Sequence, residues 1–228
     1  MFKNKKVWIF GGSGGIGREI VSCFKDYHGE VIAPTHMQID LSTREGIDEY
    51  FTDTDNTCDA VVYSAGINVP KPFEKLTEND LIAALKVNTL GFFSVCTHLV
   101  PGMKKRGGGR IVVLSSLYGI ISRRGRLPYA LSKHALGGVV QTLAMELAKD
   151  NILVNAVSPG FIGTEMTYRN NSPEKVAELT RSIPMGRLGT GREIGETAAF
   201  LCSSRNSYIT GQNIVVDGGY MVGGWQSE

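Results

Sequence analysis

Tyr129 and Lys133 are the residues with the clearest chemical potential in this sequence. They stand four positions apart in Tyr129-Ala130-Leu131-Ser132-Lys133, a segment whose pattern predicts a helix, so both side chains lie on one helix face. A free tyrosine, with a pKa of about 10, is a poor base at neutral pH, but a neighbouring ammonium group stabilises the phenolate and lowers that pKa. The pair therefore indicates proton transfer to or from an oxygen atom.

Ser116 precedes this pair and follows the apolar run Arg110–Leu114, which predicts a buried strand. Ligands of parallel sheets gather outside the carboxyl ends of the strands, so a hydroxyl group at this position can hold a substrate oxygen. Ser115 is a competing candidate, because it stands at the same strand end.

A glycine-rich turn, Gly11-Gly12-Ser13-Gly14-Gly15-Ile16-Gly17, follows the first predicted strand and leads into a predicted helix. Glycines admit a close approach of the backbone, and a helix N-terminus offers free N–H groups and partial positive charge. The position favours a site for the pyrophosphate of a dinucleotide, although a plain tight turn is the alternative. The predicted contacts are Gly11, Ser13, Gly14, Gly15, Ile16 and Gly17.

The end of the second predicted strand bears on which dinucleotide binds. In NAD-selective sites, an acidic residue about 20 positions after the glycines binds the ribose hydroxyls. Here the strand ends in Ala33-Pro34-Thr35-His36, without a carboxylate. This favours NADP(H) over NAD(H), with Arg18 and His36 as the cations nearest in sequence.

Short apolar runs alternate with longer amphipathic segments along the whole chain. The runs predict strands at Val7–Phe10, Glu30–Ala33, Ala60–Tyr63, Arg110–Leu114, Leu153–Val157 and Asn213–Val216. The segments between them predict helices at residues 15–27, 43–52, 77–105, 127–149, 174–182 and 190–204. Such alternation is typical of an α/β fold, and we expect a single domain over residues 1–228. It is a Rossmann-type, doubly wound parallel sheet with helices on both faces.

One connection departs from this alternation. Met37–Asp40 resembles a further strand, but only a few residues separate it from Glu30–Ala33, and parallel neighbours need a crossover of about a dozen residues. We therefore expect the crossover helix after the second strand to be missing, and the extra strand to be absent or a short edge piece. Asp40, with Leu41 beside it, either contacts the cofactor adenine or caps a helix.

Composition excludes several function classes. Lys and Arg number 24 against 22 Asp and Glu, a net charge of +2 that provides no basic surface for nucleic acid or an anionic membrane. No continuous run of about 20 apolar residues predicts a membrane span. The four cysteines and four histidines are scattered without the spacing of a metal site. We expect a cytoplasmic protein with no metal and with a small-molecule substrate.

Taken in order, these motifs resemble those of the classical short-chain dehydrogenase/reductase family over essentially the whole chain. The family's Gly-x-x-x-Gly-x-Gly loop matches Gly11, Gly15 and Gly17, and its serine and Tyr-x-x-x-Lys motif match Ser116, Tyr129 and Lys133. Its helix asparagine matches Asn88, and its Pro-Gly segment matches Pro159-Gly160, with Ile162 and Thr164 beyond.

The resemblance implies a role for each matched residue. Tyr129 is implied as the general acid or base on the substrate oxygen, Ser116 as the group that orients this oxygen, and Lys133 as the ligand of the nicotinamide ribose. Asn88 is implied to support a water that relays protons; its alternative role is to bond helix backbone. The nicotinamide end of the cofactor is expected to contact Pro159, Gly160, Ile162 and Thr164.

Two positions depart from the family pattern. Phe10 replaces the usual threonine before the glycine loop, and Tyr63-Ser64-Ala65-Gly66 keeps only the second half of the usual Asn-Asn-Ala-Gly stretch. Both changes bear on cofactor framing, for which Ser64, Ala65 and Gly66 remain the expected contacts, more than on proton chemistry.

Within the family the sequence looks most like the 3-oxoacyl-(acyl-carrier-protein) reductases. Lys104-Lys105-Arg106 offers one basic site for an acidic carrier protein, but Asp150 stands where a second basic residue is expected. The resemblance also implies a homodimer or homotetramer that pairs the helices over 77–105 and 127–149. A rival hypothesis is a protein that binds the cofactor as a sensor or scaffold without chemistry.

Three arginines between Ser116 and Tyr129 bear on the substrate. Guanidinium groups bind carboxylates and phosphates with two parallel hydrogen bonds. We predict an anionic substrate held by Arg124 and Arg126, with Arg123 beside them; a solvated loop is the alternative. Residues 164–185, which are rich in polar groups, are expected to cover the pocket.

Overall fold

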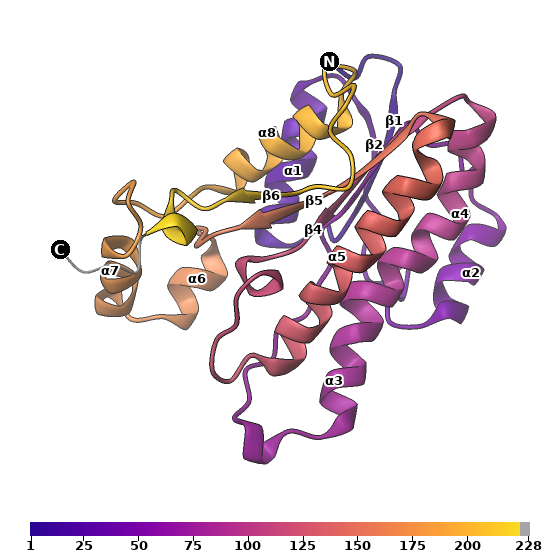
Figure 1. The fold of residues 1–228 in the computed structure, drawn as a ribbon. Helices are drawn as coiled ribbons and strands as arrows, with labels where there is room; N and C mark the ends of the chain where they lie inside the picture. The colour runs from indigo at the N-terminus through magenta and orange to yellow at the C-terminus, as the bar shows by residue number, and fades with distance from the viewer. Residues whose placement is uncertain (224–228) are drawn as a thin grey trace.

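The computed structural model describes residues 1–223, apart from the side chains of Met166 and Asn170. A six-stranded parallel sheet in the order β2-β1-β3-β4-β5-β6 forms its centre (Figure 1). Every predicted strand is present, as β1 (Lys6–Phe10), β2 (Glu30–Ile32), β3 (Ala60–Tyr63), β4 (Gly109–Leu114), β5 (Ile152–Pro159) and β6 (Asn213–Val216). Residues 224–228 of the expected domain lie outside the described residues.

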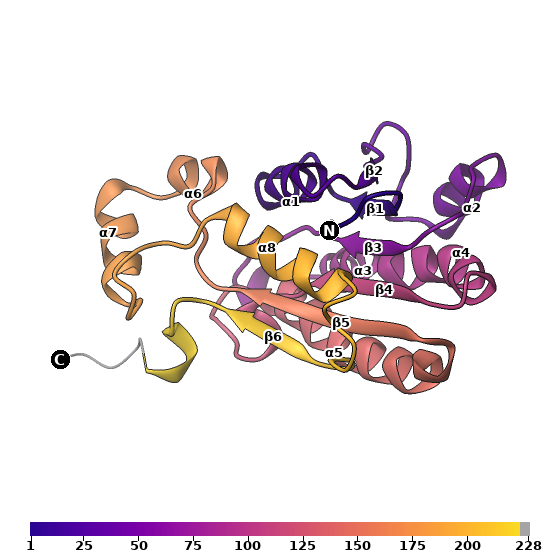
Figure 2. The same cartoon turned by 90° about the horizontal axis from the view of Figure 1, so that it is seen from above.

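Helices cover both faces of the sheet (Figure 2). One face carries α1 (Gly15–Asp26) and α8 (Gly191–Cys202), and the other carries α2 (Arg44–Thr52), α4 (Gly91–Lys105) and α5 (Leu127–Leu147). Each face has its own apolar core: Ile20 and Ile194 belong to the first, and Phe92 and Leu136 to the second. This is the doubly wound arrangement that the alternating pattern predicts.

The predicted helix over 77–105 is continuous but not uniform. It starts as α3 (Glu78–Leu85), widens into a π-helical turn over Lys86–Leu90, and continues as α4. A capping box at Thr77 begins it, and a second one at Thr190 begins α8. By length and apolarity Glu78–Lys105 could cross a membrane, and 44% of its most apolar window is buried inside the protein.

As expected, no helix lies between β2 and Met37–Asp40. Residues 33–43 form only turns before α2, which carries the chain back across the sheet to β3, on the other side of β1. Met37–Asp40 therefore forms no strand, and β2 is the edge of the sheet. The eleven residues between β2 and α2 are too few for a helix and a further parallel strand.

Two helices extend beyond the carboxyl ends of the strands, on the side where β4 and β5 end (Figure 1). They are α6 (Glu165–Asn170) and α7 (Pro173–Arg181), capped by the side chains of Thr164 and Ser172. The sequence predicts α7 but not α6, because a helix of six residues is too short to display helical periodicity. Together they form the segment that we expect to cover the pocket.

Candidate active site

The carboxyl ends of four strands bring the sequence motifs together. Gly11 follows β1, Ser64 follows β3, Ser116 follows β4, and Pro159 ends β5. These strands are neighbours in the sheet, so segments far apart in the sequence meet at one edge. Tyr129 and Lys133 reach the same edge from the first turns of α5, where Pro128 occupies an initial position that needs no amide donor.

The glycine loop is packed too tightly for side chains. Gly11 has φ +80°, and a Cβ on it would lie 2.5 Å from the backbone nitrogen of Ala65. A Cβ on Gly17 would overlap the carbonyl oxygen of Gly11. Gly14 begins α1, whose first turn carries no acidic side chain, so the free amides and the positive end of the helix dipole face the loop unopposed.

The segment after β5 closes the other side of this cradle. A Cβ on Gly15 would lie 3.0 Å from Cβ of Thr164, and one on Gly160 would lie 2.6 Å from Cα of Asp217. Ile162 is buried and pairs in a short parallel bridge with Gly189. The residues present therefore fit a dinucleotide: a cradle of bare backbone and helix amides that side chains would fill.

Lys133 is buried at the floor of the site. Its ammonium nitrogen donates to the carbonyl oxygen of Leu114 at 2.6 Å and lies 5.7 Å from the centre of the Tyr129 ring. Burial lowers the pKa of Lys133 to about 7, because the charged form has lost its hydration. Lys133 therefore holds and releases a proton near neutral pH.

Tyr129 experiences opposing influences. Burial raises the pKa of its phenol, whereas a hydrogen bond with Ser116 and the charge of Arg126 lower it. The sequence suggests Lys133 as the group that depresses this pKa. The structure instead provides Ser116 and Arg126, and a lysine that is only partly charged near pH 7 is a weak source of positive potential.

The two adjacent serines have different surroundings. Ser115 is buried, and its hydroxyl donates to the carbonyl oxygen of Lys133 at 3.4 Å, so it ties β4 to α5. Ser116 is partly exposed, accepts from the amide of Tyr118 at 3.1 Å and lies near enough to Tyr129 to lower the pKa of its phenol. Successive residues of an extended chain point to opposite sides, and only Ser116 is on the side of Tyr129.

Asn88 lies in the π-helical turn and is fully buried. Its amide group donates to the carbonyl oxygen of Ile67 at 3.0 Å and to the Ser132 hydroxyl at 2.8 Å, and its oxygen accepts from the amide of Ile67 at 2.8 Å. A Cβ on Gly66 would lie 3.2 Å from the Asn88 oxygen and 3.5 Å from the Lys133 nitrogen. Gly66 therefore leaves open the space between these two polar groups.

Asp40 and Leu41 lie in the turn that precedes α2. Asp40 accepts from the amide of Ser42 at 2.8 Å and from its hydroxyl at 2.6 Å, while Thr43 caps the helix itself. These hydrogen bonds lower the pKa of Asp40. The carbonyl of Leu41 lies against Gly91, at the start of α4. The aspartate thus shapes the turn before the helix.

The three arginines make different contacts, although Arg123 and Arg124 both line one small cavity of about 180 Å³. Arg126 donates to the Asn68 side chain at 2.9 Å, and Arg124 lines a surface cavity of about 610 Å³ with Pro70 to Glu74. Arg123 donates to the hydroxyl of Tyr118 at 3.1 Å. The Tyr118 ring packs edge-on against Tyr129, with centroids 6.3 Å apart and an interplanar angle of 83°. Sequence reasoning missed Tyr118, although its position just after Ser116 could have indicated it.

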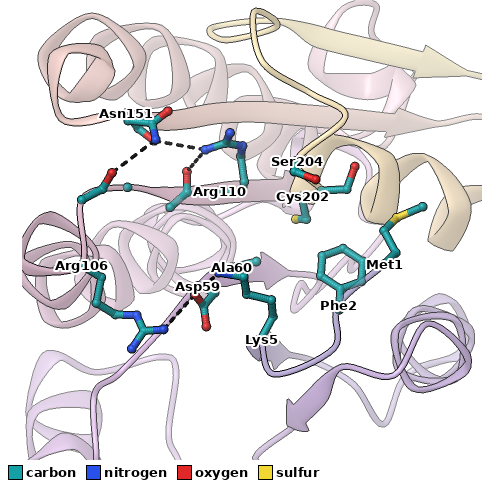
Figure 3. A pocket seen from close by; sticks show the side chains of 14 residues that line it. Met1, Phe2, Lys5, Asp59, Ala60, Arg106, Arg110, Asn151, Cys202 and Ser204 are labelled. Atoms are coloured by element: carbon teal, nitrogen blue, oxygen red, sulfur yellow. Dashed lines mark hydrogen bonds and ion pairs between the residues drawn. The ribbon is translucent and has the colours of Figure 1, made fainter.

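A cavity of about 520 Å³ at the opposite, amino-terminal edge of the sheet is not the active site (Figure 3). Most of its charged groups have protein partners, although Nε of Arg110 is buried without one. Arg110 donates to the carbonyl oxygens of Gly109, Asn151 and Asn206. Asp59 pairs with Lys5 at 3.0 Å and with Arg106 at 3.1 Å. The cavity is thus lined by an arginine that donates to backbone carbonyls and by an aspartate that is already paired with two cations.

Known proteins of similar sequence show to which family this chain belongs. A family profile described as enoyl-(acyl carrier protein) reductase matches residues 15–221. The chain is 43% identical over 165 residues to a 3-oxoacyl-(acyl-carrier-protein) reductase of Thermotoga maritima, covering 72% of this chain and 66% of that protein. It is 32% identical over 239 residues to the Chlamydia pneumoniae protein of the same name, covering 94% and 96%. The chain belongs to the short-chain dehydrogenase/reductase family.

Solved structures of this family share the whole fold. A protein described as an NAD(P)-dependent gluconate 5-dehydrogenase from Beutenbergia cavernae, with bound NADP, superposes with a TM-score of 0.87 at 28% identity, covering 96% of this chain and 98% of that one. A gluconate dehydrogenase from Agrobacterium tumefaciens gives a TM-score of 0.88 at 26% identity, covering 96% and 97%. The chain is therefore an oxidoreductase that acts between CH–OH and C=O groups with a nicotinamide dinucleotide.

Proposed function

We propose that this protein reduces a ketone to a secondary alcohol, and reverses the reaction, with Tyr129 as the general acid and base. One observation carries the proposal: Tyr129 lies beside Ser116, which lowers the pKa of its phenol, and its ring centre is 5.7 Å from the ammonium nitrogen of the buried Lys133. Bound in the glycine cradle, the nicotinamide supplies or accepts the hydride.

The residues proposed to hold the cofactor fall into three groups. The pyrophosphate is assigned to the loop and helix start, Gly11, Ser13, Gly14, Gly15, Ile16 and Gly17. The adenosine side is assigned to Asp40, Leu41, Ser64, Ala65 and Gly66. The nicotinamide side is assigned to Tyr129, Lys133, Pro159, Gly160, Ile162 and Thr164. The contacts of Gly11 with Ala65 and of Gly15 with Thr164 support this division, because they join the three groups into one cradle.

The pKa values suit a proton donor. Because burial raises the pKa of Tyr129, its hydroxyl stays protonated at neutral pH and is ready to protonate the oxygen of a reduced carbonyl. Ser116 donates to the same oxygen and orients it. Lys133, with a pKa of about 7, then restores the proton of Tyr129, and Asn88 is assigned to support a water through which protons relay.

We further propose a preference for NADP(H) over NAD(H). β2 ends without a carboxylate, so no negative charge opposes a phosphorylated ribose there. Arg18, on the first turn of α1, is held at 3.5 Å from Glu165 of α6 by an exposed ion pair, which a phosphate can displace cheaply. Titration of NADPH and NADH by fluorescence tests this preference, and tighter binding of NADH would contradict it.

A 3-oxoacyl-(acyl-carrier-protein) substrate is the alternative reading, supported by the names of the most similar sequences. The expected carrier docking site argues against it here. Lys104 is neutralised by Asp150 at 2.7 Å, and Arg106 by Asp59 at 3.1 Å, which leaves Lys105 as the remaining cation of this run. Reduction of acetoacetyl-carrier protein at a far higher rate than of carrier-free ketones would favour the alternative.

The protein is proposed to be cytoplasmic and to form a homodimer or homotetramer. The outer face of the long helices exposes apolar side chains: Leu90 is 54% exposed, Phe93 46% and Leu131 39%. A monomer would leave this surface in water at a cost of about 25 cal/mol per Å². Sedimentation of the protein and of Phe93→Glu tests the assembly, and a monomeric wild type at micromolar concentration would refute it.

The test of the reaction is oxidation of NADPH, followed by absorbance, across a panel of ketones, with an enoyl thioester included. Tyr129→Phe removes the acid while keeping the ring, and should lower kcat by roughly a hundredfold to ten-thousandfold without weakening NADPH binding. Full activity in Tyr129→Phe would refute the proposed mechanism. Binding of NADPH without turnover of any compound would favour the scaffold hypothesis.

A further inference from the structure

Arg123 is the arginine that the tertiary structure places beside the reaction centre. Its guanidinium donates to the Tyr118 hydroxyl at 3.1 Å, and the Tyr118 ring contacts Tyr129 edge-on. One aromatic ring therefore separates the Arg123 cation from the proposed acid. Arg124 lines the surface cavity behind this loop, and Arg126 is bound by Asn68.

Arg123 lies in the gap between three segments of the chain. Besides Tyr118, the groups whose charge reaches it are Tyr220, from the 3-10 turn after β6, and Glu178, on α7. The cation thus lies near α7 and the turn after β6, one aromatic ring away from Tyr129. A side chain at this distance from Tyr129 can meet a part of the substrate that is remote from the reacting carbon.

The polar groups of this pair remain available to a ligand. Among the described residues Arg123 has no carboxylate partner within 4.0 Å. Both oxygens of Glu178 are occupied by Lys175 at 2.7 Å. The Tyr118 oxygen accepts from Arg123, so its own proton is free to donate. Two donors therefore converge, one charged and one neutral.

We propose that Arg123 and Tyr118 together bind an anionic group of the substrate, a carboxylate or a phosphate, at the end remote from the reacting ketone. The guanidinium offers further N–H groups in a planar fork that matches such an anion, and the Tyr118 hydroxyl adds a third donor. The enzyme then prefers oxo acids or phosphorylated ketones to neutral ketones. This inference rests on the proposed carbonyl reduction.

The experiment compares substrates that differ only in charge. Methyl-ketone acids of increasing chain length are each paired with their methyl ester, and dihydroxyacetone phosphate is paired with dihydroxyacetone. With the wild type, kcat/KM should be higher for the anion at the chain length that spans Tyr129 and Arg123. Arg123→Ala should lower the ratio of kcat/KM between acid and ester by roughly tenfold or more, mainly through KM.

Matched variants separate the anchor from its neighbours. Arg124→Ala removes the same charge one position away and should keep the preference for the anion, since Arg123 and not Arg124 donates to the Tyr118 hydroxyl. Tyr118→Phe keeps the ring against Tyr129 and should lose part of the preference. Arg123→Lys should recover some of it, because an ammonium keeps the charge but not the fork. The carboxylate and phosphate pairs distinguish the two kinds of anion.

The outcomes distinguish this inference from the proposed function. If ketones are reduced but the acid-to-ester ratio is the same in wild type and Arg123→Ala, the anchor is refuted while the reaction stands. If no ketone is reduced, calorimetric titration of the anions into the protein saturated with NADP+ decides: binding that Arg123→Ala abolishes supports the anchor, and equal binding or none refutes it.

Discussion

Lys133 provides the most demanding test of the physical reasoning, because its burial should make the folded protein less stable at neutral pH. Its side chain is 4% exposed, and its pKa falls from an ordinary 10.5 to about 7. At about 1.4 kcal/mol per pKa unit, burial of this amine lowers the free energy of unfolding by up to about 5 kcal/mol. The full effect applies at pH values where the lysine is charged in the unfolded state.

The sign of the pH dependence follows from linkage. Between pH 7 and 10.5 the unfolded chain binds a proton at this lysine that the folded chain does not, so stability rises with pH over this interval. The penalty is full below the folded pKa and disappears above the unfolded one. For these two values it is about 4 kcal/mol near pH 7 and about 2 kcal/mol near pH 9.

Lys133→Met removes the amine while keeping most of the volume. The variant should gain stability over the wild type near pH 7, less whatever it loses by leaving the Leu114 carbonyl without its donor. That loss does not vary with pH. The difference in unfolding free energy between variant and wild type should therefore shrink by about 2 kcal/mol from pH 7 to pH 9.

Urea unfolding at the two pH values, at one protein concentration, measures this difference. Lys105→Met, which removes an exposed lysine, is the control and should show no such change. A difference between Lys133→Met and the wild type that stays constant from pH 7 to pH 9 would refute the reasoning, because it would mean that Lys133 keeps an ordinary pKa in the folded protein. Activity of the variant is expected to be lost, so stability and function trade against each other here.

Other substitutions test the cradle, the asparagine and a helix cap. Gly17→Ala should lower the melting temperature and abolish NADPH binding, because the new methyl overlaps the Gly11 carbonyl, whereas Gly14→Ala, at 3.5 Å from the same oxygen, should fold normally. Asn88→Ala leaves the Ile67 backbone groups without partners and should lower the unfolding free energy by about 2 kcal/mol, with a loss of activity. Unchanged stability would show that water replaces the Asn88 side chain. Thr190→Ala removes a capping box and should cost about 1 kcal/mol in urea unfolding, with NADPH binding unchanged.

Much of the fold could be predicted because its signals are local. Each strand is a short apolar run, such as Ala60–Tyr63, which forms β3 with those bounds. Thr77 and Thr190 mark helix starts through hydrogen bonds that span three residues. The absence of a helix and a further strand between β2 and α2 could also be foreseen, because the eleven residues of this connection are too few to form both.

Features that depend on distant partners could not be predicted in this way. The π-helical turn that carries Asn88 leaves no periodic signature, since it inserts into a helix that is otherwise regular. The turn before α2, in which the Asp40 carboxylate accepts from Ser42, is one such feature. The short helix α6 is set by Thr164 and by its packing beyond the sheet rather than by an apolar stripe.

For the site, the sequence by itself determined which residue types are present and that Tyr129 and Lys133 share a helix face, because that follows from helix geometry. The tertiary structure alone decided how these groups behave. It separated Ser116 from Ser115, placed Arg123 rather than Arg124 on the Tyr118 hydroxyl, and buried Lys133 deeply enough to move its pKa to about 7. Side-chain direction, burial and charge arise from chain segments that meet only after folding, so no local pattern encodes them.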